Sequence, residues 1–426
     1  MLAAALLAAG CTQDKSVGQS DDGSSSNSSG GDSGASQGPI KIGYSYLDFG
    51  DLVDKGLAAQ GWGDQELAFQ TFVDDLNAND GINGRQVEAV YAPYTPLGTE
   101  AAEAACLQLT EDEDVFAVVG GFLGPAEPAN TCIAGQQETV LAGGILSEER
   151  LEAAKAPWIA ERPLRTRQAE ILFGLLEDDG KLDDAKVAVV TSTDAEDVRG
   201  GVIDTMGEFG VEPVSDLVSD AAVGDITAED NVWATFAERI RSDDANTVLL
   251  VGNASAGIRN VAAQGLDVDV WVLDQETLTQ LGSSVNLEDA RGAVAAASMT
   301  GQDLWDDETA KECRDIYEKA NPDVEIIEPD DLEEGDENVP QGVVVACRFL
   351  RLFQAVAENV EGDLTNDSFQ AAADSLGDFS LPGQPFASLT ADKHDANDSF
   401  RLVSFDPDIG QNGGFENLTD IADATP

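Results

Sequence analysis

The chain has 426 residues, of which 81 are acidic and 23 are basic, so its formal net charge is −58. Such a charge repels nucleic-acid phosphates and anionic lipid headgroups, which practically excludes a nucleic-acid-binding protein. The acidic residues are scattered along the whole chain, which indicates a solvated surface suited to salty surroundings, or a compositional bias of the lineage. The length is sufficient for two domains with cores of their own.

The N-terminal segment has the pattern of a lipoprotein signal peptide. An apolar run from Met1 to Ala9 ends at Gly10-Cys11, and this run is too short to span a bilayer. We therefore expect residues 1–11 to form a signal peptide that ends at a lipidated Cys11. No Lys or Arg precedes the apolar run. The alternative is an apolar N-terminus with a chance cysteine.

Residues 12–38 are almost entirely Ser, Gly, Asp, Asn and Gln. With no apolar cluster to bury, this segment is predicted to be a disordered linker. Together with the lipid, it would hold a folded body on the outer face of the cell membrane. Without the lipid, the body would be secreted.

The first half of the folded body alternates apolar strands with helices. Near-continuous apolar strands in this arrangement indicate a parallel sheet covered on both faces, and therefore an α/β fold. The expected strands are 41–46, 86–91, 115–121 and 139–145, and the expected helices are 67–76, 101–110 and 126–136.

The alternation pauses at Glu161-Arg162-Pro163 and again at the Gly/Ala-rich segment 291–300. Two α/β lobes, each entered more than once by the chain, would explain these pauses as crossings between lobes. Between and after the pauses we expect strands at 186–191, 214–218, 247–251, 270–274, 386–389 and 401–405, and helices at 308–319, 342–358 and 367–375.

The sequence lacks the usual catalytic motifs. Asn253-Ala254-Ser255-Ala256-Gly257 lacks the first glycine of a nucleophile elbow, and neither a Walker loop nor a dinucleotide fingerprint is present. The one histidine, His394, lies in a polar run typical of a loop. We therefore expect a protein that is not an enzyme and that has no cofactor and no metal site.

Four cysteines remain beyond Cys11. An even number in an exported protein suggests two disulfides with three possible connectivities, the alternative being buried thiols. Their spacing matches no zinc signature. They are Cys106, Cys132, Cys313 and Cys347.

Polar and small residues follow the predicted strands, where ligands bind in open parallel sheets. Hydroxyl groups and glycine amides suit a carboxylate, acidic side chains suit an ammonium group, and Tyr46 and Phe122 could cover an apolar part. The alternative is that these are ordinary capping and turn residues. The candidate ligand-binding residues are Tyr46, Leu47, Phe122, Leu123, Gly124, Gly144, Ser147, Thr193, Asp194, Asn253, Ser255, Asp274 and Glu276.

Three motifs match a known family. They are Ile42-Gly43 in the first strand, the turn Asn-Asp-Gly-Ile-Asn-Gly-Arg at 79–85, and Cys106 followed by Val-Phe-Ala-Val-Val-Gly at 115–120. With these, the segment 39–405 resembles the type I periplasmic-binding-protein superfamily, specifically the branched-chain amino acid (leucine/isoleucine/valine-type) solute-binding proteins of ABC transporters.

The resemblance implies two Rossmann-like lobes with a ligand cleft between them. The N-terminal lobe would comprise 39–163 plus 297–376, and the C-terminal lobe 164–296 plus 377–420. Three crossings would fall near 162–163, 292–298 and 377–381. The resemblance also implies a Cys106–Cys132 bridge, which leaves Cys313 to pair with Cys347.

The functional implication is an extracytoplasmic, lipid-anchored subunit of an ABC importer. As a monomer it would capture a small polar solute, such as an amino acid or amide, by lobe closure and deliver it to a permease driven by an ATPase. In this family the loop after the strand near Gly120 holds a carboxylate, and Asp274 or Glu276 would hold the ammonium group.

Two features add to or depart from this expectation. The loop Phe122-Leu123-Gly124-Pro125 lacks the family's Ser/Thr-rich form. An acidic insertion at 48–64 could favour a cationic or zwitterionic solute. The alternatives are a ligand-sensing receptor module of the same fold and, more remotely, an anchored hydrolase.

Overall fold

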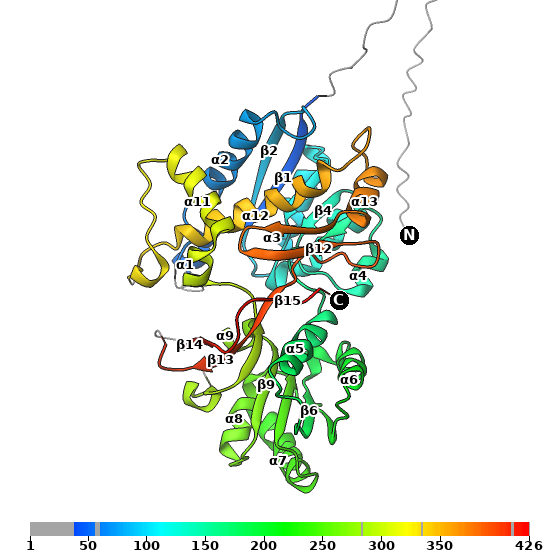
Figure 1. The fold of residues 1–426 in the computed structure, drawn as a ribbon, viewed down its shortest axis with the longest axis vertical. Coiled ribbons are helices and arrows are strands. Elements are labelled where there is room, and N and C mark those ends of the chain that lie inside the picture. The colour runs from blue at the N-terminus through cyan, green and yellow to red at the C-terminus, as the bar shows by residue number, and fades with distance from the viewer. Residues whose placement is uncertain (1–37, 56–59, 283, 334, 410–412, 426) are drawn as a thin grey trace, which may run out of the picture. The chain divides into compact units, whose positions relative to one another are not determined.

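The computed structural model describes residues 38–55, 60–282, 284–333, 335–409 and 413–425 (Figure 1). The predicted signal peptide, Cys11 and all of the linker except residue 38 lie outside the described residues. The predicted fold class is confirmed: the chain is α/β, with two large sheets built mainly of parallel strands.

The first sheet contains five parallel strands in the order β2-β1-β3-β4-β5. Every residue of β3 and β4 is buried, which explains their unbroken apolar sequences. The predicted strands in this region are confirmed. Their bounds are β1 Ile40–Leu47, β2 Val87–Tyr94, β3 Ala117–Gly120, β4 Val140–Gly143 and β5 Trp158–Ile159.

Helices pack on both faces of this sheet. On one face, Phe69 of α2 stacks on Tyr44 of β1, and Phe353 of α12 stacks on Phe369 of α13. The other face is covered by α3 and the turns that follow β3. The α-helices of this part are α1 Phe49–Asp54, α2 Gln65–Ala78, α3 Glu100–Leu107, α4 Glu148–Ala153, α10 Gly301–Asp306, α11 Glu308–Ala320, α12 Val339–Ala357 and α13 Asn366–Asp374.

The helix predicted at 126–136 is not an α-helix. The structure has a 3₁₀ helix, η2 (Gly124–Ala129), followed by a π-helical turn, η3 (Cys132–Gln136). Pro125 and Pro128 lack the backbone N–H that an α-helical turn would use. The helix predicted at 101–110 likewise ends in a π-helical turn, η1 (Gln108–Asp112).

The second sheet has the strand order β14-β13-β10-β9-β8-β6-β7, with β15 paired to β13. Strands β10, β9, β8, β6 and β7 are parallel, whereas β13 is antiparallel to β10. The bounds are β6 Val187–Thr191, β7 Ser215–Val218, β8 Thr247–Val251, β9 Asp269–Asp274, β10 Val294–Ala297, β13 Ser399–Asp406, β14 Gly414–Asn417 and β15 Ala422–Asp423.

Helices also cover both faces of the second sheet. Helix α5 packs against β9, β10 and β13 on one face, and Trp233 of α7 and Ile258 of α8 belong to the core on the other face. The helices are α5 Arg167–Asp178, α6 Arg199–Glu208, α7 Ile226–Ser242, α8 Ser255–Ala263 and α9 Gln275–Thr279, with short 3₁₀ turns η4 Thr193–Ala195, η5 Leu287–Ala290 and, after α11, η6 Pro329–Asp331.

Two of the segments predicted as crossings contain strands. The segment 291–300 contains β10, a buried strand of the second sheet. The segment 377–381 is strand β11 (Gly377–Leu381), which pairs with β12 (Gln384–Leu389) in a two-stranded sheet. Leu381 and Leu389 belong to the same core as α12, so the chain reaches the second sheet only after this hairpin.

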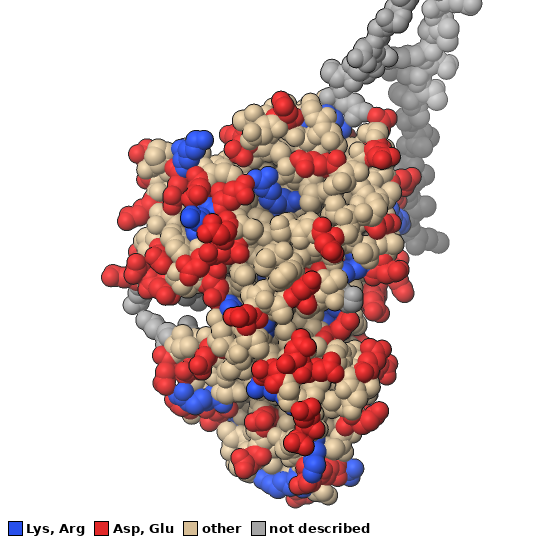
Figure 2. Space-filling view, in the orientation of Figure 1, with Lys and Arg blue, Asp and Glu red and all other residues tan. Residues whose placement is uncertain are grey.

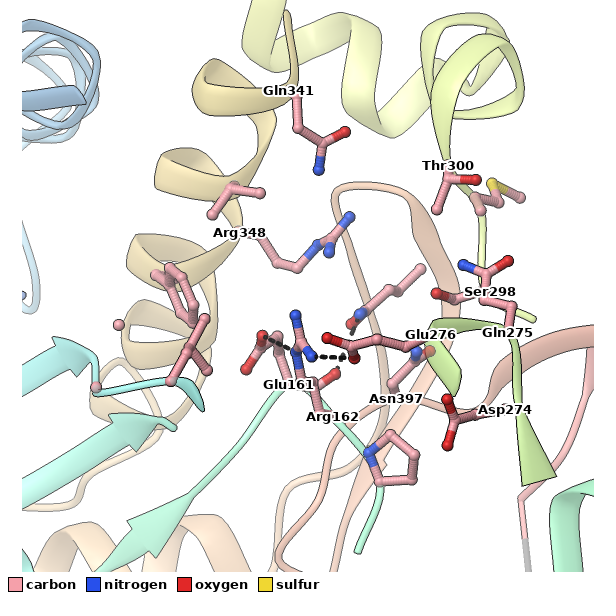
Figure 3. A pocket seen from close by; sticks show the side chains of 18 of the residues that line it. Glu161, Arg162, Asp274, Gln275, Glu276, Ser298, Thr300, Gln341, Arg348 and Asn397 are labelled. Atoms are coloured by element: carbon pink, nitrogen blue, oxygen red, sulfur yellow. Dashed lines mark hydrogen bonds and ion pairs between the residues drawn. The ribbon is translucent and has the colours of Figure 1, made fainter. Parts of the chain in front are cut away.

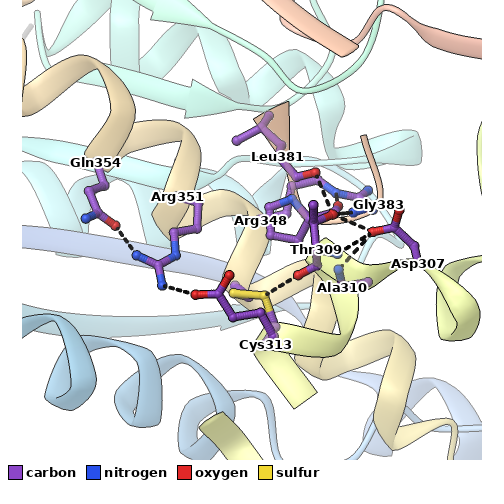
Figure 4. The surroundings of a disulfide bond; sticks show 12 residues. Asp307, Thr309, Ala310, Cys313, Arg348, Arg351, Gln354, Leu381 and Gly383 are labelled. Carbon is purple, nitrogen blue, oxygen red and sulfur yellow. Dashed lines mark hydrogen bonds and ion pairs between the residues drawn. A yellow bond between two sulfur atoms is a disulfide. The ribbon is translucent and has the colours of Figure 1, made fainter. Parts of the chain in front are cut away.

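Both predicted disulfides are confirmed. Cys106 of α3 is bonded to Cys132 of η3, and Cys313 of α11 is bonded to Cys347 of α12 (Figure 4). The apolar helix α12 is long and apolar enough to cross a membrane, but most of it is buried in the core beside the first sheet.

Candidate functional site

A cavity of about 370 Å³ lies at the carboxyl ends of strands from both sheets. Residues at the ends of β1, β3 and β5 form one side, and residues at the ends of β9 and β10 form the other. Helix α12 contributes Gln341, Val345, Arg348 and Phe349, whose spacing places them on one helix face. Figure 3 shows Gln341 and Arg348 projecting from this helix above Arg162.

Part of the cavity wall is aromatic. Tyr44 and Tyr46 of β1 stack with ring centroids 5.3 Å apart, and Trp62 stacks on Phe49 at 4.4 Å. The Tyr46 hydroxyl donates to Glu66 Oε1 at 2.6 Å, so the polar end of this ring has a partner. These rings, with Phe349 and Phe400, offer an apolar surface to a ligand body.

An ion pair joins the two sides of the cavity. Arg162, just after β5, donates to Glu276 Oε2 of α9 at 2.8 Å and lies 3.5 Å from Glu161 Oε1. Burial lowers the pKa of Arg162, but Glu276 and Glu161 outweigh this effect and hold the pKa above its ordinary value. Arg162 therefore remains a cation with its charge already matched.

Glu161 is a buried carboxyl group with an unsatisfied oxygen. Its side chain is 8% exposed, and its Oε2 makes no hydrogen bond. Burial raises its pKa above the ordinary value, although Arg162 and Arg348 both act to lower it. The buried Oε1 of Gln384 also lacks a partner. Both atoms belong to residues that line the cavity.

Arg348 is held by a backbone carbonyl rather than by an acid. Its Nε donates to the Pro382 oxygen at 2.7 Å, in the turn between β11 and β12. In the part of the chain that the structure describes, Arg348 forms no ion pair. Burial lowers its pKa to about 10, so the group is still charged at neutral pH.

The loop after β3 uses its own amides internally. The Phe122 N–H donates to Asn130 Oδ1 at 2.8 Å, and the Leu123 N–H donates to the Tyr94 hydroxyl at 2.9 Å. These two donors are therefore not free for a carboxylate, although the resemblance assigns that role to this loop.

The structure brings some of the predicted ligand-binding residues together. Tyr46, Leu47, Leu123, Asp274 and Glu276 line the cavity. Asp194, Asn253 and Ser255 line a second cavity of about 360 Å³, which shares Arg162, Asp274 and Glu276 with the first.

The other predicted residues have local structural roles. Phe122 is fully buried and packs edge-on against Tyr94, so its ring cannot cover a ligand as the sequence suggested. The Thr193 hydroxyl donates to the Ala221 oxygen. Gly144 packs against Asn130, Ser147 caps α4, and Gly124 begins η2 with a positive φ of 59°.

Several residues that line the cavity are not among those predicted from the sequence. Glu161 and Arg162 were assigned only to a crossing, and Arg348 was assigned only to an apolar helix. The available signal for Arg348 was a basic residue inside an apolar helix in a chain with few basic residues. The others include Gln341, Ser298, Thr300, Gln384 and Asn397. Across the described ranges, His, Cys, Asp and Glu side chains form no group of three that could hold a metal ion.

The family model described as "Periplasmic binding protein" matches residues 39–412. The chain belongs to this family. Membership supports a solute-binding role and an extracytoplasmic location, and it accounts for a cleft between two α/β lobes. No protein of curated function matches the chain significantly.

Solved periplasmic binding proteins share the fold at low sequence identity. A possible leucine/isoleucine/valine-binding protein from Rhodopirellula baltica is 17% identical in sequence, with a TM-score of 0.55. The match covers 90% of this chain and 96% of that protein's chain. LivJ from Streptococcus pneumoniae, solved with isoleucine, is 18% identical with a TM-score of 0.55, covering 90% and 99%. A solute-binding protein from R. palustris, solved with 4-hydroxybenzoate, is 14% identical with a TM-score of 0.58, covering 91% and 98%.

Proposed function

We propose that the chain is the solute-binding subunit of an ABC importer, anchored outside the cell membrane through Cys11. It captures a small polar solute as a monomer and delivers it to a permease that an ATPase drives. The observation that carries the proposal is the cavity lined from both sheets by charged and aromatic groups. A small solute in such a cavity contacts both lobes at once.

The lobes follow from the two sheets. We propose an N-terminal lobe of 39–163 and 298–389 and a C-terminal lobe of 164–297 and 399–420. We assign the hairpin β11–β12 to the N-terminal lobe, because Leu381 and Leu389 share its core. The segment 390–398 then becomes the third crossing, next to the crossing at 160–166.

Closure of the cleft provides the mechanism. A solute that touches residues of both lobes, such as Tyr46 and Asp274, makes more contacts in a closed form than in an open one. This difference in affinity shifts the population toward the closed form, which the permease recognises. The chemistry required is binding and release, and no covalent step is assigned to the chain.

Thermal-shift screening of the purified protein tests this proposal. The panel contains amino acids, their amides, aromatic carboxylates and urea, and hits are verified by calorimetry. A solute at a hundredfold excess over its Kd should stabilise the protein by about 2.7 kcal/mol. Uptake of a hit into vesicles that carry the partner permease and ATPase should require this chain. Absence of any hit, or turnover of a hit, contradicts the proposal.

A further inference from the structure

We propose that Arg348 is the anchor for a carboxylate of the solute, so that the cavity selects carboxylates over the corresponding neutral amides. This inference rests on the proposed function and assigns the class of solute. It assigns carboxylate binding to helix α12, whereas the resemblance assigned it to the loop after β3.

The first argument is the balance of charges around the cavity. Arg162 is matched by Glu276 at 2.8 Å and by Glu161 at 3.5 Å. Arg348 makes no ion pair with any described residue, although acidic side chains outnumber basic ones by 81 to 23 in this chain. A guanidinium that is left unpaired beside a cavity is the natural partner of an anion, which it can bind with two parallel hydrogen bonds.

The second argument is that Arg348 is fixed in place. Its Nε is engaged by the Pro382 oxygen, so the hydrogen bond does not use the two terminal nitrogens. A second hydrogen bond fixes the turn that carries Pro382. The N–H of Gly383, in the same turn, donates to Thr309 Oγ1 at 3.0 Å. Figure 4 shows this turn beside Arg348, and Figure 3 shows the Arg348 side chain projecting from α12 into the cavity.

Glycine at position 383 is part of this arrangement. Its φ is +70°, and a Cβ at that position would lie 2.9 Å from Arg348 Nη2. Cys347, the residue before Arg348, is bonded to Cys313, which ties this turn of α12 to α11. A cation that is positioned before the ligand arrives loses little conformational freedom on binding.

The third argument is that two N–H groups of the loop after β3 are already engaged. The N–H groups of Phe122 and Leu123 are committed to Asn130 and Tyr94. A solute carboxylate in this cavity therefore finds its charged donor on α12. The unpartnered Oε2 of Glu161 and Oε1 of Gln384 lie around the same cavity and are available to polar groups of the solute.

The test compares Arg348→Gln with Arg351→Gln on the full chain. Arg351 is on the same helix, but it contacts Gln354 and Glu312 outside the cavity (Figure 4). The probes are two matched pairs, isoleucine with isoleucinamide and 4-hydroxybenzoate with 4-hydroxybenzamide, together with any acid found in the screen and its amide. Calorimetry gives each Kd, and circular dichroism with thermal melting verifies the fold.

The wild type should bind an acid more tightly than its amide. Arg348→Gln should weaken acid binding by about 10- to 100-fold, with little change for the amide, whereas Arg351→Gln should bind both as the wild type does. Arg348→Lys keeps the charge but loses the planar fork, so it should retain part of the affinity. This variant keeps the test decisive if the Gln variant fails to fold.

The outcomes separate the two proposals. Binding of an acid that is unchanged in Arg348→Gln, or a wild-type preference for the amide, overturns the assignment of Arg348 and leaves the solute-binding role intact. Failure of the wild type to bind any acid or amide overturns the proposed function and this inference together.

Discussion

Arg162 Nη1 lies 2.8 Å from Glu276 Oε2, and this contact joins the end of β5 to helix α9 across the cleft. The resemblance assigned Glu276 or Asp274 to a solute ammonium group. Glu276 already has a cationic partner, and Asp274 caps α9 by accepting the Thr277 N–H at 3.0 Å. Glu276 therefore forms an ion pair across the cavity and is not an empty ammonium site.

Glu276→Gln should have a small effect. The two side chains are 39% and 55% exposed, and such pairs contribute about 0–1 kcal/mol. We expect the affinity of the variant for a carboxylic acid to stay within about fivefold of the wild-type affinity. It should be slightly higher, because the cleft loses a negative charge. Calorimetry with an acid found in the screen measures this. A loss greater than tenfold would instead show that Glu276 binds the solute.

Glu161 makes stability depend on pH. Its folded pKa is raised above the ordinary value of 4.5, because burial disfavours the charged form more than Arg162 and Arg348 favour it. The folded state therefore binds this proton more tightly than the unfolded state does. The stabilisation is complete below pH 4.5 and is lost as pH rises through the folded pKa.

Glu161→Gln should remove that dependence. The variant should be more stable than the wild type at neutral pH, and the difference should disappear toward pH 4. Urea unfolding across this range provides the measurement, with Glu103→Gln on the exposed face of α3 as the control. Equal pH profiles for Glu161→Gln and wild type would mean that Glu161 is ionised in the folded protein.

Strand positions could be predicted from sequence because the parallel strands are buried on both faces. Strands such as β6 and β8 are continuous apolar runs with no polar residue except Thr191 or Thr247 at one end. Strand β10 was missed because its sequence is Val-Ala-Ala-Ala, and alanine is depleted in strands. Its pairing with β9 and β13 determines its conformation.

The site was harder to predict than the fold. A residue near a strand end can line the cleft, as Tyr46 does, or lie in the core, as Phe122 does, and the sequence does not determine which. Arg348 is far in sequence from β1 and β3, so its place beside them depends on how α12 packs on the first sheet. Only this packing shows that Arg348 faces the cleft whereas Arg351 does not.

Arg167 of α5 forms ion pairs with buried acids in the segment that precedes β13. It lies 2.8 Å from Asp395 and contacts Asp398, and both carboxylates are fully buried. Lys393 joins the group at 3.2 Å from Asp398, and the Ser388 hydroxyl donates to Asp398 at 2.6 Å. These groups lie between α5 and the segment that leads into β13.

Asp398→Asn should therefore be strongly destabilising. Removing one partner of a buried ionic network leaves cations unmatched, at a cost of about 3–5 kcal/mol. Urea unfolding measures the loss. Asp244→Asn, which breaks the exposed pair with Lys186, is the matched control and should unfold as the wild type does. Similar behaviour of the two variants would exclude a structural role for the Arg167 network.

The two disulfides should differ in their effect on binding. Replacing Cys106 and Cys132 by Ser should lower stability by about 2–5 kcal/mol without changing the affinity of folded protein for an acid. Replacing Cys313 and Cys347 should cost a similar amount and also weaken acid binding, because Cys347 immediately precedes Arg348. Melting and calorimetry at a temperature where both variants are folded distinguish the effects. Unchanged affinity in both would show that the packing of α12 alone positions Arg348.

The net charge of −58 predicts that salt stabilises the folded protein. Figure 2 shows Asp and Glu side chains spread over the visible face, where they repel one another. The screening length falls from about 30 Å at 0.01 M salt to about 3 Å at 1 M, so the melting temperature should rise across this range. An uncharged osmolyte is the control, because it is excluded from the protein surface but does not screen charges. It should raise the melting temperature less than KCl does. A melting temperature that KCl leaves unchanged would mean that local ion pairs, such as Arg291 with Asp406, already offset the repulsion.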